Sequence, residues 1–419
     1  MTLLADLLST VFERRYRRDP SAAEQDGRPL IELASALVGS AGETSGLALA
    51  QEILTRFAQL DDGDKLAFFH EIAKTMNIDP ETVRTTLDEY ERTPSKASYR
   101  AFAAASEPAR QELIRRLNQV PGATGELVKM RADLLMLGNR DPELEALDLD
   151  FRHLFASWFN RGFLVLRPIN WESPAHILEK IIAYEAVHAI DSWSDLRRRL
   201  EPTDRRCFAF FHPSMPDEPL IFVEVALIKG IPNSVQSLLI EDRAPLPASE
   251  AETAVFYSIS NCQAGLASIS FGNSLIKQVA ADLATELPGL KTFVTLSPIP
   301  GLTKWLDQHD LNWDPSDAHQ QKTLAAHYLL NAKSRGGLPF DPVARFHLGN
   351  GAIVHAVHAG ADTSVKGQAQ SAGLMVNYLY DLERVAQNHE NFANTREIVS
   401  SAEVKSLAGQ VEPLKPEER

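Results

Sequence analysis

The pattern of apolar residues changes near residue 160, and this change limits the possible folds more than any other feature of the chain. Before it, apolar residues recur with the spacing of one helix face, as at Leu66, Phe69, Ile72 and Met76. Prolines such as Pro80 interrupt the pattern at short intervals. We therefore predict about seven or eight short helices up to residue 160. No fixed repeat period is visible, which favours a bundle over a solenoid.

After residue 160, the apolar residues form continuous or alternating runs that are typical of strands. The clearest runs are residues 162–166, 207–211, 220–228, 254–259, 292–296, 351–357 and 374–380. A long helix is predicted from Asn273 to Leu287, and strand, loop, helix, strand is a crossover unit. Because 419 residues are many for one core, we predict a helical domain (1–155), a mixed α/β domain (156–408) and a frayed polar tail (409–419).

Composition narrows the choice of partners. The formal net charge of -14 argues against nucleic acid as the main ligand. No segment approaches about 18 consecutive apolar residues, so we expect no membrane span, and the N-terminus lacks a secretory signal pattern. Cys207 and Cys262 show neither metal-ligand spacing nor a disulfide framework, which favours a reducing, cytoplasmic location.

A glycine-containing loop at residues 265–273 leads into the predicted helix. Small residues let backbone N–H groups approach a ligand, and a helix N-terminus favours an anion. A tight turn is the alternative, and spacing alone favours the turn. The basic residues 197–199 and 205–206 could join an anion-binding patch, or they form the solvated face of a helix and its exit.

Ser297 and His347 are candidates for chemistry. Ser297 ends a predicted strand, a rigid position that active sites often use, although a Ser-Pro turn is the alternative. His347 has apolar neighbours and precedes two glycines, and a structural histidine is its alternative. His355 and His358 would face opposite sides of a strand, so we expect no metal there. No nucleophile elbow, P-loop or His-Glu-x-x-His motif occurs, so these residues alone leave the function open.

The chain resembles the malonyl-CoA decarboxylase family in segments that follow the family's order over nearly all of residues 130–405. The most distinctive are Leu-Ser-Pro-Ile-Pro-Gly at 296–301 and Phe-His-Leu-x-Asn-Gly-Ala at 346–352. The others include Ser-Trp-Phe at 157–159, Glu-Ala-Val-His at 185–188, Phe-Tyr-Ser-Ile-Ser at 256–260, Thr-Lys-Trp at 303–305 and Gly-Leu-Met at 373–375.

This resemblance implies a fold, a reaction and an assembly. The family has a helical N-terminal domain used in assembly, with a homotetramer as precedent. Its catalytic domain has the fold of GNAT-type acetyltransferases, whose splayed central strands accept an acyl-CoA. The implied reaction turns malonyl-CoA into acetyl-CoA and CO2 without cofactor or metal, because the thioester itself accepts the electrons.

Site residues are implied in the same way. The catalytic pair is Ser297 and His347, with Ser258 and Tyr380 around the acyl pocket. The acyl-CoA loop consists of Ala267, Ser268, Ile269, Ser270, Phe271, Gly272 and Asn273. Ser270 stands where animal members carry an acidic residue. Their longer insertion between the Thr-Lys-Trp segment and the histidine is much shortened here, and their peroxisomal C-terminal tripeptide is absent.

Ser297 would orient the malonyl carboxylate, and His347 would protonate or polarise the enolate. An imidazole with a reference pKa of about 6.5 is expected to keep both protonation states accessible near neutral pH. Backbone amides at residues 258–260 are candidates for holding the enolate oxygen. A GNAT-type acyl-CoA transferase is the main alternative and would need an acceptor. A Ser-His hydrolase lacks an acidic third member, and a CoA-binding scaffold would bind without turnover.

Overall fold

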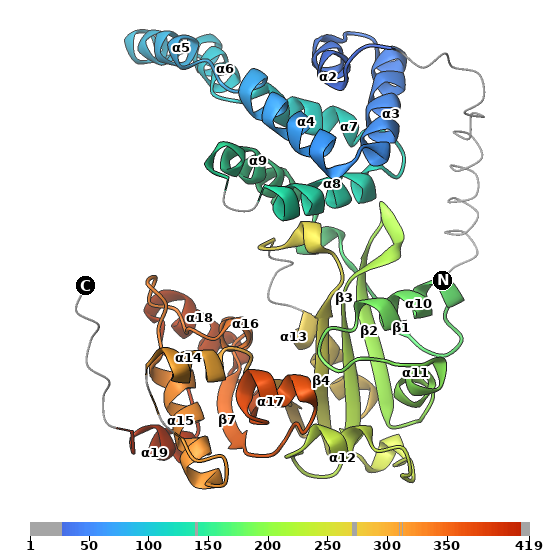
Figure 1. The fold of residues 1–419 in the computed structure, drawn as a ribbon, viewed down its shortest axis with the longest axis vertical. Coiled ribbons are helices and arrows are strands. Elements are labelled where there is room, and N and C mark those ends of the chain that lie inside the picture. The colour runs from blue at the N-terminus through green and yellow to red at the C-terminus, as the bar shows by residue number, and fades with distance from the viewer. Residues whose placement is uncertain (1–26, 139–140, 270–274, 310, 312, 412–419) are drawn as a thin grey trace. The chain divides into compact units, whose positions relative to one another are not determined.

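The computed structural model describes residues 27–138, 141–269, 275–309, 311 and 313–411 (Figure 1). The chain divides into two compact units. The first consists of Met1–Asn160 together with Gln263–Ile269, and the second of Arg161–Cys262 with Ser270–Arg419. Among the described residues, no helix combines the length and apolar character that a membrane span needs.

The described part of the first unit is helical, as predicted. Its α-helices are α2 (Leu30–Gly39), α3 (Glu43–Gln59), α4 (Asp62–Thr75), α5 (Pro80–Arg92), α6 (Lys96–Ala105), α7 (Ala109–Leu117), α8 (Ala123–Leu137) and α9 (Pro142–Trp158). Two of them begin with an Asp-Pro pair, Asp79-Pro80 and Asp141-Pro142. The aspartate accepts backbone N–H groups of the first turn, and proline at the first helical position loses no hydrogen bond.

The second unit contains one mixed sheet with the strand order β1-β2-β3-β4-β5-β8-β6, and β7 pairs with β8. The strands are β1 (Val165–Ile169), β2 (Arg205–His212), β3 (Met215–Ile228), β4 (Thr253–Asn261), β5 (Thr292–Thr295), β6 (Ser297–Pro298), β7 (Ile353–His358) and β8 (Met375–Leu379). Strands β1 to β4 pair antiparallel, and β4 pairs parallel with β5. The predicted class, a helical domain followed by a mixed α/β domain, is confirmed.

Helices cover both faces of this sheet (Figure 1). They are α10 (Ala175–Tyr184), α11 (Trp193–Leu200), α12 (Val235–Leu239), α13 (Leu275–Glu286), α14 (Leu302–Gln308), α15 (Ala318–Asn331), α16 (Pro342–Gly349), α17 (Val365–Ser371), α18 (Val385–Thr395) and α19 (Ala402–Ala408). On one face, Val223 and Phe256 share a core with α13 to α16. On the other, Phe222 packs with Ile177 of α10 and Leu196 of α11. Because side chains alternate along the strands, each face has its own core, and Ala226 and Val255 form a third buried cluster with Val235 of α12.

The two parallel central strands diverge, as the GNAT-type fold implies. Their pairing ends at Phe256↔Thr295, followed by a hydrogen bond of 3.1 Å from the Leu296 N–H to the Phe256 carbonyl. Strand β4 continues to Asn261, whereas the chain leaving β5 turns into β6 and pairs with β8. Ser297 therefore begins β6, directly after the bend that follows β5 and close to the end of the predicted strand.

The limits of the units differ from the predicted domain limits. Helix α9 continues to Trp158, beyond residue 155, and the helical unit includes residues 263–269 from the middle of the chain. At the C-terminus, Gln410 is held by a 2.9 Å hydrogen bond to His319, and residues 412–419 of the predicted tail lie outside the described residues.

Candidate functional site

Ser297 and His347 lie next to each other although fifty residues separate them. The Ser297 Oγ is 3.2 Å from the His347 Nε2, and both side chains are buried. Ser297 comes from β6. His347 comes from α16, which begins at Pro342 and is capped by Asp341, whose Oδ1 accepts the Ala344 N–H at 2.7 Å. The fold therefore brings the two predicted catalytic residues into contact.

A chain of hydrogen bonds runs through this pair. The Ser297 hydroxyl donates to the Thr295 Oγ1 at 2.8 Å, and Thr295 also accepts the Tyr378 N–H at 3.1 Å. Since Ser297 has only one proton to donate, its contact with His347 is made by the imidazole Nε2–H donating to the serine oxygen. The His347 Nδ1, 2.9 Å from the Tyr380 hydroxyl, then accepts the tyrosine proton. These partners define the Nε2–H tautomer of His347.

Burial keeps His347 uncharged. The pKa of its imidazole falls from the reference value of 6.5 to about 3, because removal from water penalises the charged form. Its ring stacks on Tyr378, with centroids 4.5 Å apart and planes at 23°. The expectation that both protonation states are accessible near neutral pH is therefore wrong, and His347 acts as a neutral hydrogen-bonding group.

Two members of this group, Thr295 and Tyr378, were missed by the sequence analysis. Each lies two residues before a predicted site residue, Thr295 before Ser297 and Tyr378 before Tyr380. Residues two apart on a strand point to the same face. The alternation of side chains along the predicted strands was thus the signal that could have identified both.

Ser258 belongs to a different polar group. Its hydroxyl lies 2.7 and 2.8 Å from the two carboxylate oxygens of Glu185, which also accepts the Val187 and His188 N–H groups at 2.8 Å. Ser258 pairs in register with Glu224, on the face that holds α10 and α11. The face of the sheet that holds Tyr380 is the opposite one. The side chain of Ser258 is therefore separated by the sheet from His347, unlike Tyr380, which contacts it.

Glu224 is the most deeply buried ionisable side chain of this second polar group. It is fully buried, and its carboxylate lies 3.3 Å from the Arg199 Nη1. Burial, followed by repulsion from Glu185, raises the pKa of Glu224 to about 8. Arg199 also bonds the Asp195 carboxylate and the His188 carbonyl. These bonds tie the loop after α10 to the sheet, a structural task.

The predicted acyl-CoA loop is only partly described. Ala267, Ser268 and Ile269 belong to the helical unit, where they follow a 3₁₀ turn, η4 (Ala264–Leu266). Ser268 has a left-handed backbone with φ +63°, which is uncommon for a residue other than glycine. The other predicted members, Ser270, Phe271, Gly272 and Asn273, lie outside the described residues.

The basic runs bind to the protein itself. Arg197 and Arg198 pair with Glu201 and Glu241 on the surface, whereas Arg199 is buried against Asp195 and Glu224. Arg205 and Arg206 also bind to other parts of the protein. The buried Arg205 donates to the Leu238 carbonyl, and Arg206 pairs with Glu286. Neither run lies free for an anion, and the solvated-helix interpretation holds only for the exposed members.

No metal-binding constellation is visible among the described residues. His358 instead lies 2.5 Å from the Asn377 side-chain oxygen. Cys207 and Cys262 are buried free thiols. The residues present thus offer hydrogen bonds rather than a metal-ligand set.

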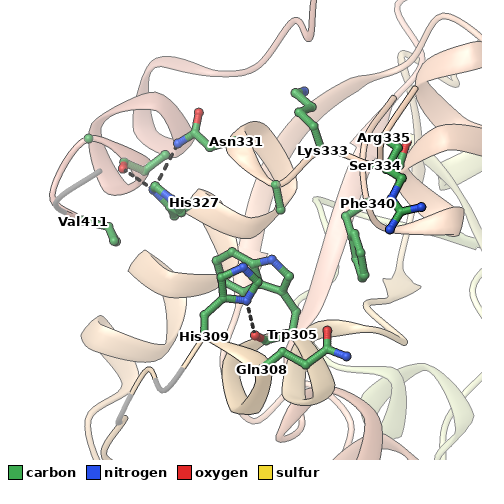
Figure 2. A pocket seen from close by; sticks show the side chains of 13 residues that line it. Trp305, Gln308, His309, His327, Asn331, Lys333, Ser334, Arg335, Phe340 and Val411 are labelled. Carbon is green, nitrogen blue, oxygen red and sulfur yellow. Dashed lines mark hydrogen bonds between the residues drawn. The ribbon is translucent and has the colours of Figure 1, made fainter. Parts of the chain in front are cut away.

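A hollow of about 970 Å³ lies elsewhere in the second unit (Figure 2). Trp305, His309, His327 and Phe340 are among the residues that line it, and the His309 Nδ1 is 2.8 Å from the Trp305 carbonyl oxygen. Its lining residues do not include Ser297, His347 or Tyr380. The hollow is therefore separate from the catalytic candidates.

Comparison with known proteins gives matches along both units. A family model for the malonyl-CoA decarboxylase C-terminal domain matches residues 162–322 and 314–418, and one for the N-terminal domain matches residues 76–159. Mitochondrial malonyl-CoA decarboxylase from Rattus norvegicus is 35% identical over 358 residues, covering 72% of each chain. The protein of that name from Anser anser anser is 34% identical, covering 72% of this chain and 70% of its own.

Solved structures agree with these matches. The crystal structure of malonyl-CoA decarboxylase from Rhodopseudomonas palustris has a TM-score of 0.85 and 48% identity, covering 90% of this chain and 98% of its own. That from Agrobacterium vitis has a TM-score of 0.85 and 46% identity, covering 90% and 99%. The likeness therefore extends over nearly the whole chain.

Proposed function

This chain belongs to the malonyl-CoA decarboxylase family, and we propose that its Ser297–His347 pair carries out the decarboxylation of malonyl-CoA to acetyl-CoA and CO2. The observation that supports this assignment is the buried chain of hydrogen bonds from Thr295 through Ser297 and His347 to Tyr380. The hydrogen-bonded side chains present neutral donors, which suit a reaction in which negative charge moves within the substrate.

The substrate supplies the electron sink. The bond between the methylene and carboxylate carbons breaks, its electron pair moves onto the thioester as an enolate, and CO2 leaves. Uptake of one proton at carbon then gives acetyl-CoA. The protein must hold the breaking bond perpendicular to the thioester plane and stabilise the enolate oxygen with preorganised donors.

Ser297 orients the carboxylate in this proposal. Without substrate, the Ser297 hydroxyl donates to Thr295; with substrate, it donates to a carboxylate oxygen of the malonyl group. The Ser297 oxygen still accepts the His347 Nε2–H in both cases. His347 acts as a polarising donor. A neutral imidazole that gave up its only N–H proton would become an anion in a buried site, which is unfavourable.

The same hydrogen-bond directions disfavour a serine hydrolase. A nucleophilic serine needs the unprotonated ring nitrogen opposite its hydroxyl, and a carboxylate that accepts from the other nitrogen. Here the Nε2 carries the proton toward Ser297, and the Nδ1 accepts from Tyr380. The polarity of the chain is thus reversed relative to a hydrolytic triad.

The test is turnover by purified protein without added cofactor. Malonyl-CoA is supplied, and acetyl-CoA and CO2 are followed by chromatography. Ser297→Ala and His347→Asn should each lower kcat by about 100-fold or more, with a much smaller effect on KM. Ser258→Ala, on the opposite sheet face, tests the expectation that Ser258 lies around the acyl pocket: a raised KM would support it, and unchanged kcat and KM would remove Ser258 from the pocket.

Other outcomes would overturn the assignment. Product formation only after addition of an amine would identify an acyl-CoA transferase. Binding without turnover would identify a CoA-binding scaffold. A loss confined to KM in the Ser297 and His347 variants would remove both residues from the chemical step.

Three further expectations stay predictions. Ala267, Ser268 and Ile269 would contact the acyl-CoA, which analogue binding to single variants can test. Assembly into a homotetramer through the helical unit can be tested by light scattering. A cytoplasmic location can be tested by fractionation of cells that express the chain.

A further inference from the structure

Arg131 of α8 is buried and bonds one carboxylate and two backbone carbonyls. It is only 1% exposed. Its Nε donates to the Asp148 Oδ1 at 2.8 Å, and its Nη1 donates to the carbonyls of Gly265 and Ala267 at 2.7 and 2.9 Å. The carboxylate compensates the charge of the guanidinium, so the two carbonyl bonds can serve to fix a remote part of the chain.

That remote part is the start of the predicted acyl-CoA segment. Gly265 lies so close to α8 that an added Cβ would come within 1.8 Å of the Val128 carbonyl oxygen, which excludes any other residue without a shift of backbone. The next residue, Leu266, is buried. Contacts on both sides of the turn thus hold it against α8 at one position.

The residue that follows the Arg131-bound carbonyls has an unfavourable backbone. Ser268, directly after Ala267, has φ +63°. A residue other than glycine adopts this backbone conformation only when its surroundings impose it. The Ile269 N–H closes a 3.0 Å bond back to the Leu266 carbonyl. A guanidinium that fixes the preceding carbonyls is a physical means of imposing this geometry.

We infer that Arg131 is a positioning residue for acyl-CoA binding: it holds Gly265 and Ala267 so that residues 267–269 keep one conformation. This inference rests on the proposed function. It gives the helical unit a role in substrate affinity as well as in folding.

A second buried arginine in the same unit provides a matched control. Arg110 of α7 is paired with Asp150 and directs a further bond to the Ala73 carbonyl. These partners belong to α9 and α4, so loss of Arg110 would damage the helical core without touching residues 263–269. A purely structural role for Arg131 predicts that the two arginines behave alike.

The experiment compares Arg131→Met, Arg131→Lys and Arg110→Met in the full chain. Arg131→Met is expected to raise KM for malonyl-CoA roughly tenfold or more, because two charge-assisted hydrogen bonds are lost, with kcat within about threefold. Arg131→Lys should raise KM less, because an ammonium can still bond one carbonyl. Arg110→Met should lower the melting temperature with KM unchanged.

A binding measurement separates this inference from the proposed function. The dissociation constant of free CoA, measured by calorimetry, should rise in Arg131→Met by about the same factor as KM. If the wild type binds CoA but does not decarboxylate malonyl-CoA, the proposed function fails. The ratio of the CoA dissociation constants of Arg131→Met and the wild type then still decides the role of Arg131. Equal KM changes in the Arg131 and Arg110 variants, or unchanged KM and CoA affinity in both Arg131 variants, would overturn the inference. If Arg131→Met does not fold, Arg131→Lys carries the comparison.

Discussion

The imidazole of His347 lies nearly parallel to the phenol ring of Tyr378, with 4.5 Å between the ring centroids. The stack covers a face of the imidazole with an aromatic ring. The two nitrogens at its edge are occupied by Ser297 and Tyr380. Because water is excluded from such a ring, the protonation behaviour of His347 can be predicted from its surroundings.

We expect His347 to stay neutral from pH 8 down to about pH 5, because burial lowers its pKa to about 3. Histidine-selective NMR titration, with the His347→Asn variant for assignment, should show an Nε2–H tautomer that does not titrate in this range. The folded pKa lies below the unfolded value of 6.5, so the unfolded chain binds the extra proton between these values. This group therefore lowers stability as pH falls below about 6.5. A His347 resonance that titrates near pH 6.5 would contradict this.

Tyr380→Phe should lower kcat about tenfold with little change in KM. The change leaves the buried Nδ1 of His347 without a donor, and an unsatisfied buried group costs about 1–3 kcal/mol. Tyr378→Phe is the matched control, since the Tyr378 hydroxyl has no hydrogen-bond partner among the described residues, while its ring remains to stack on His347. Steady-state kinetics should show kcat reduced only in the Tyr380 variant. An equal loss in both would show that ring packing matters, rather than the Tyr380 proton.

Asp341→Ala should lower both the melting temperature and kcat. Asp341 caps α16, the helix that carries His347, and accepts the Tyr328 hydroxyl at 3.5 Å. Loss of a cap costs about 0.5–2 kcal/mol and frees the helix end. Asp341→Asn keeps an acceptor oxygen and should retain kcat within about threefold.

A control for this helix-cap effect is Asp317→Ala, at the N-cap of α15, where Asp317 accepts the His319 N–H at 2.9 Å. It should lower the melting temperature without lowering kcat.

Burial raises the pKa of Asp341 to about 6, above its reference value of 3.8, so wild-type stability should fall as pH rises from about 4 to 6. Asp341→Asn should not show this fall. If Asp341→Asn loses as much kcat as Asp341→Ala, the charge of Asp341 matters rather than the cap.

Glu224→Gln should stabilise the protein at pH 8 but not at pH 4.5. The folded pKa of Glu224 is raised from 4.5 to about 8, so the folded chain binds more protons than the unfolded chain between these values. Wild-type stability therefore decreases as pH rises through this window, and the glutamine variant escapes that decrease. Thermal unfolding at the two pH values measures the difference. A variant less stable than wild type at pH 8 would show that Glu224 is ionised and stabilised by Arg199.

Local patterns in the sequence predicted the elements well, because periodicity reports directly on which face of a helix or strand is buried. The first part of the chain forms helices, as predicted. The predicted strand run 254–259 falls within β4. Contacts between distant segments were not available from periodicity. The proximity of Ser297 and His347 came from the resemblance to the family, since neither spacing nor composition links two residues fifty apart.

The contact of Ser258 with Glu185 shows why some side-chain neighbours could not be predicted from the sequence. A register shift between Glu224 and Val225 in the β3–β4 pairing changes the alternation of side chains along β4. The sequence carries no clear mark of such a bulge. Likewise, Gly265 suggested a turn or an anion cradle, whereas its close approach to Val128 depends on a helix far away in the chain.

The two buried cysteine thiols can be used to measure local opening of the protein around them. Cys207 lies on β2 and Cys262 directly follows β4, and burial raises the pKa of both thiols above the usual value. Only a thiolate reacts readily with an alkylating reagent, so labelling must wait until the strand moves out of the core. These are the only cysteines in the sequence. Mass spectrometry of alkylated protein over time would therefore measure how often each of two sheet positions opens, and whether substrate slows it.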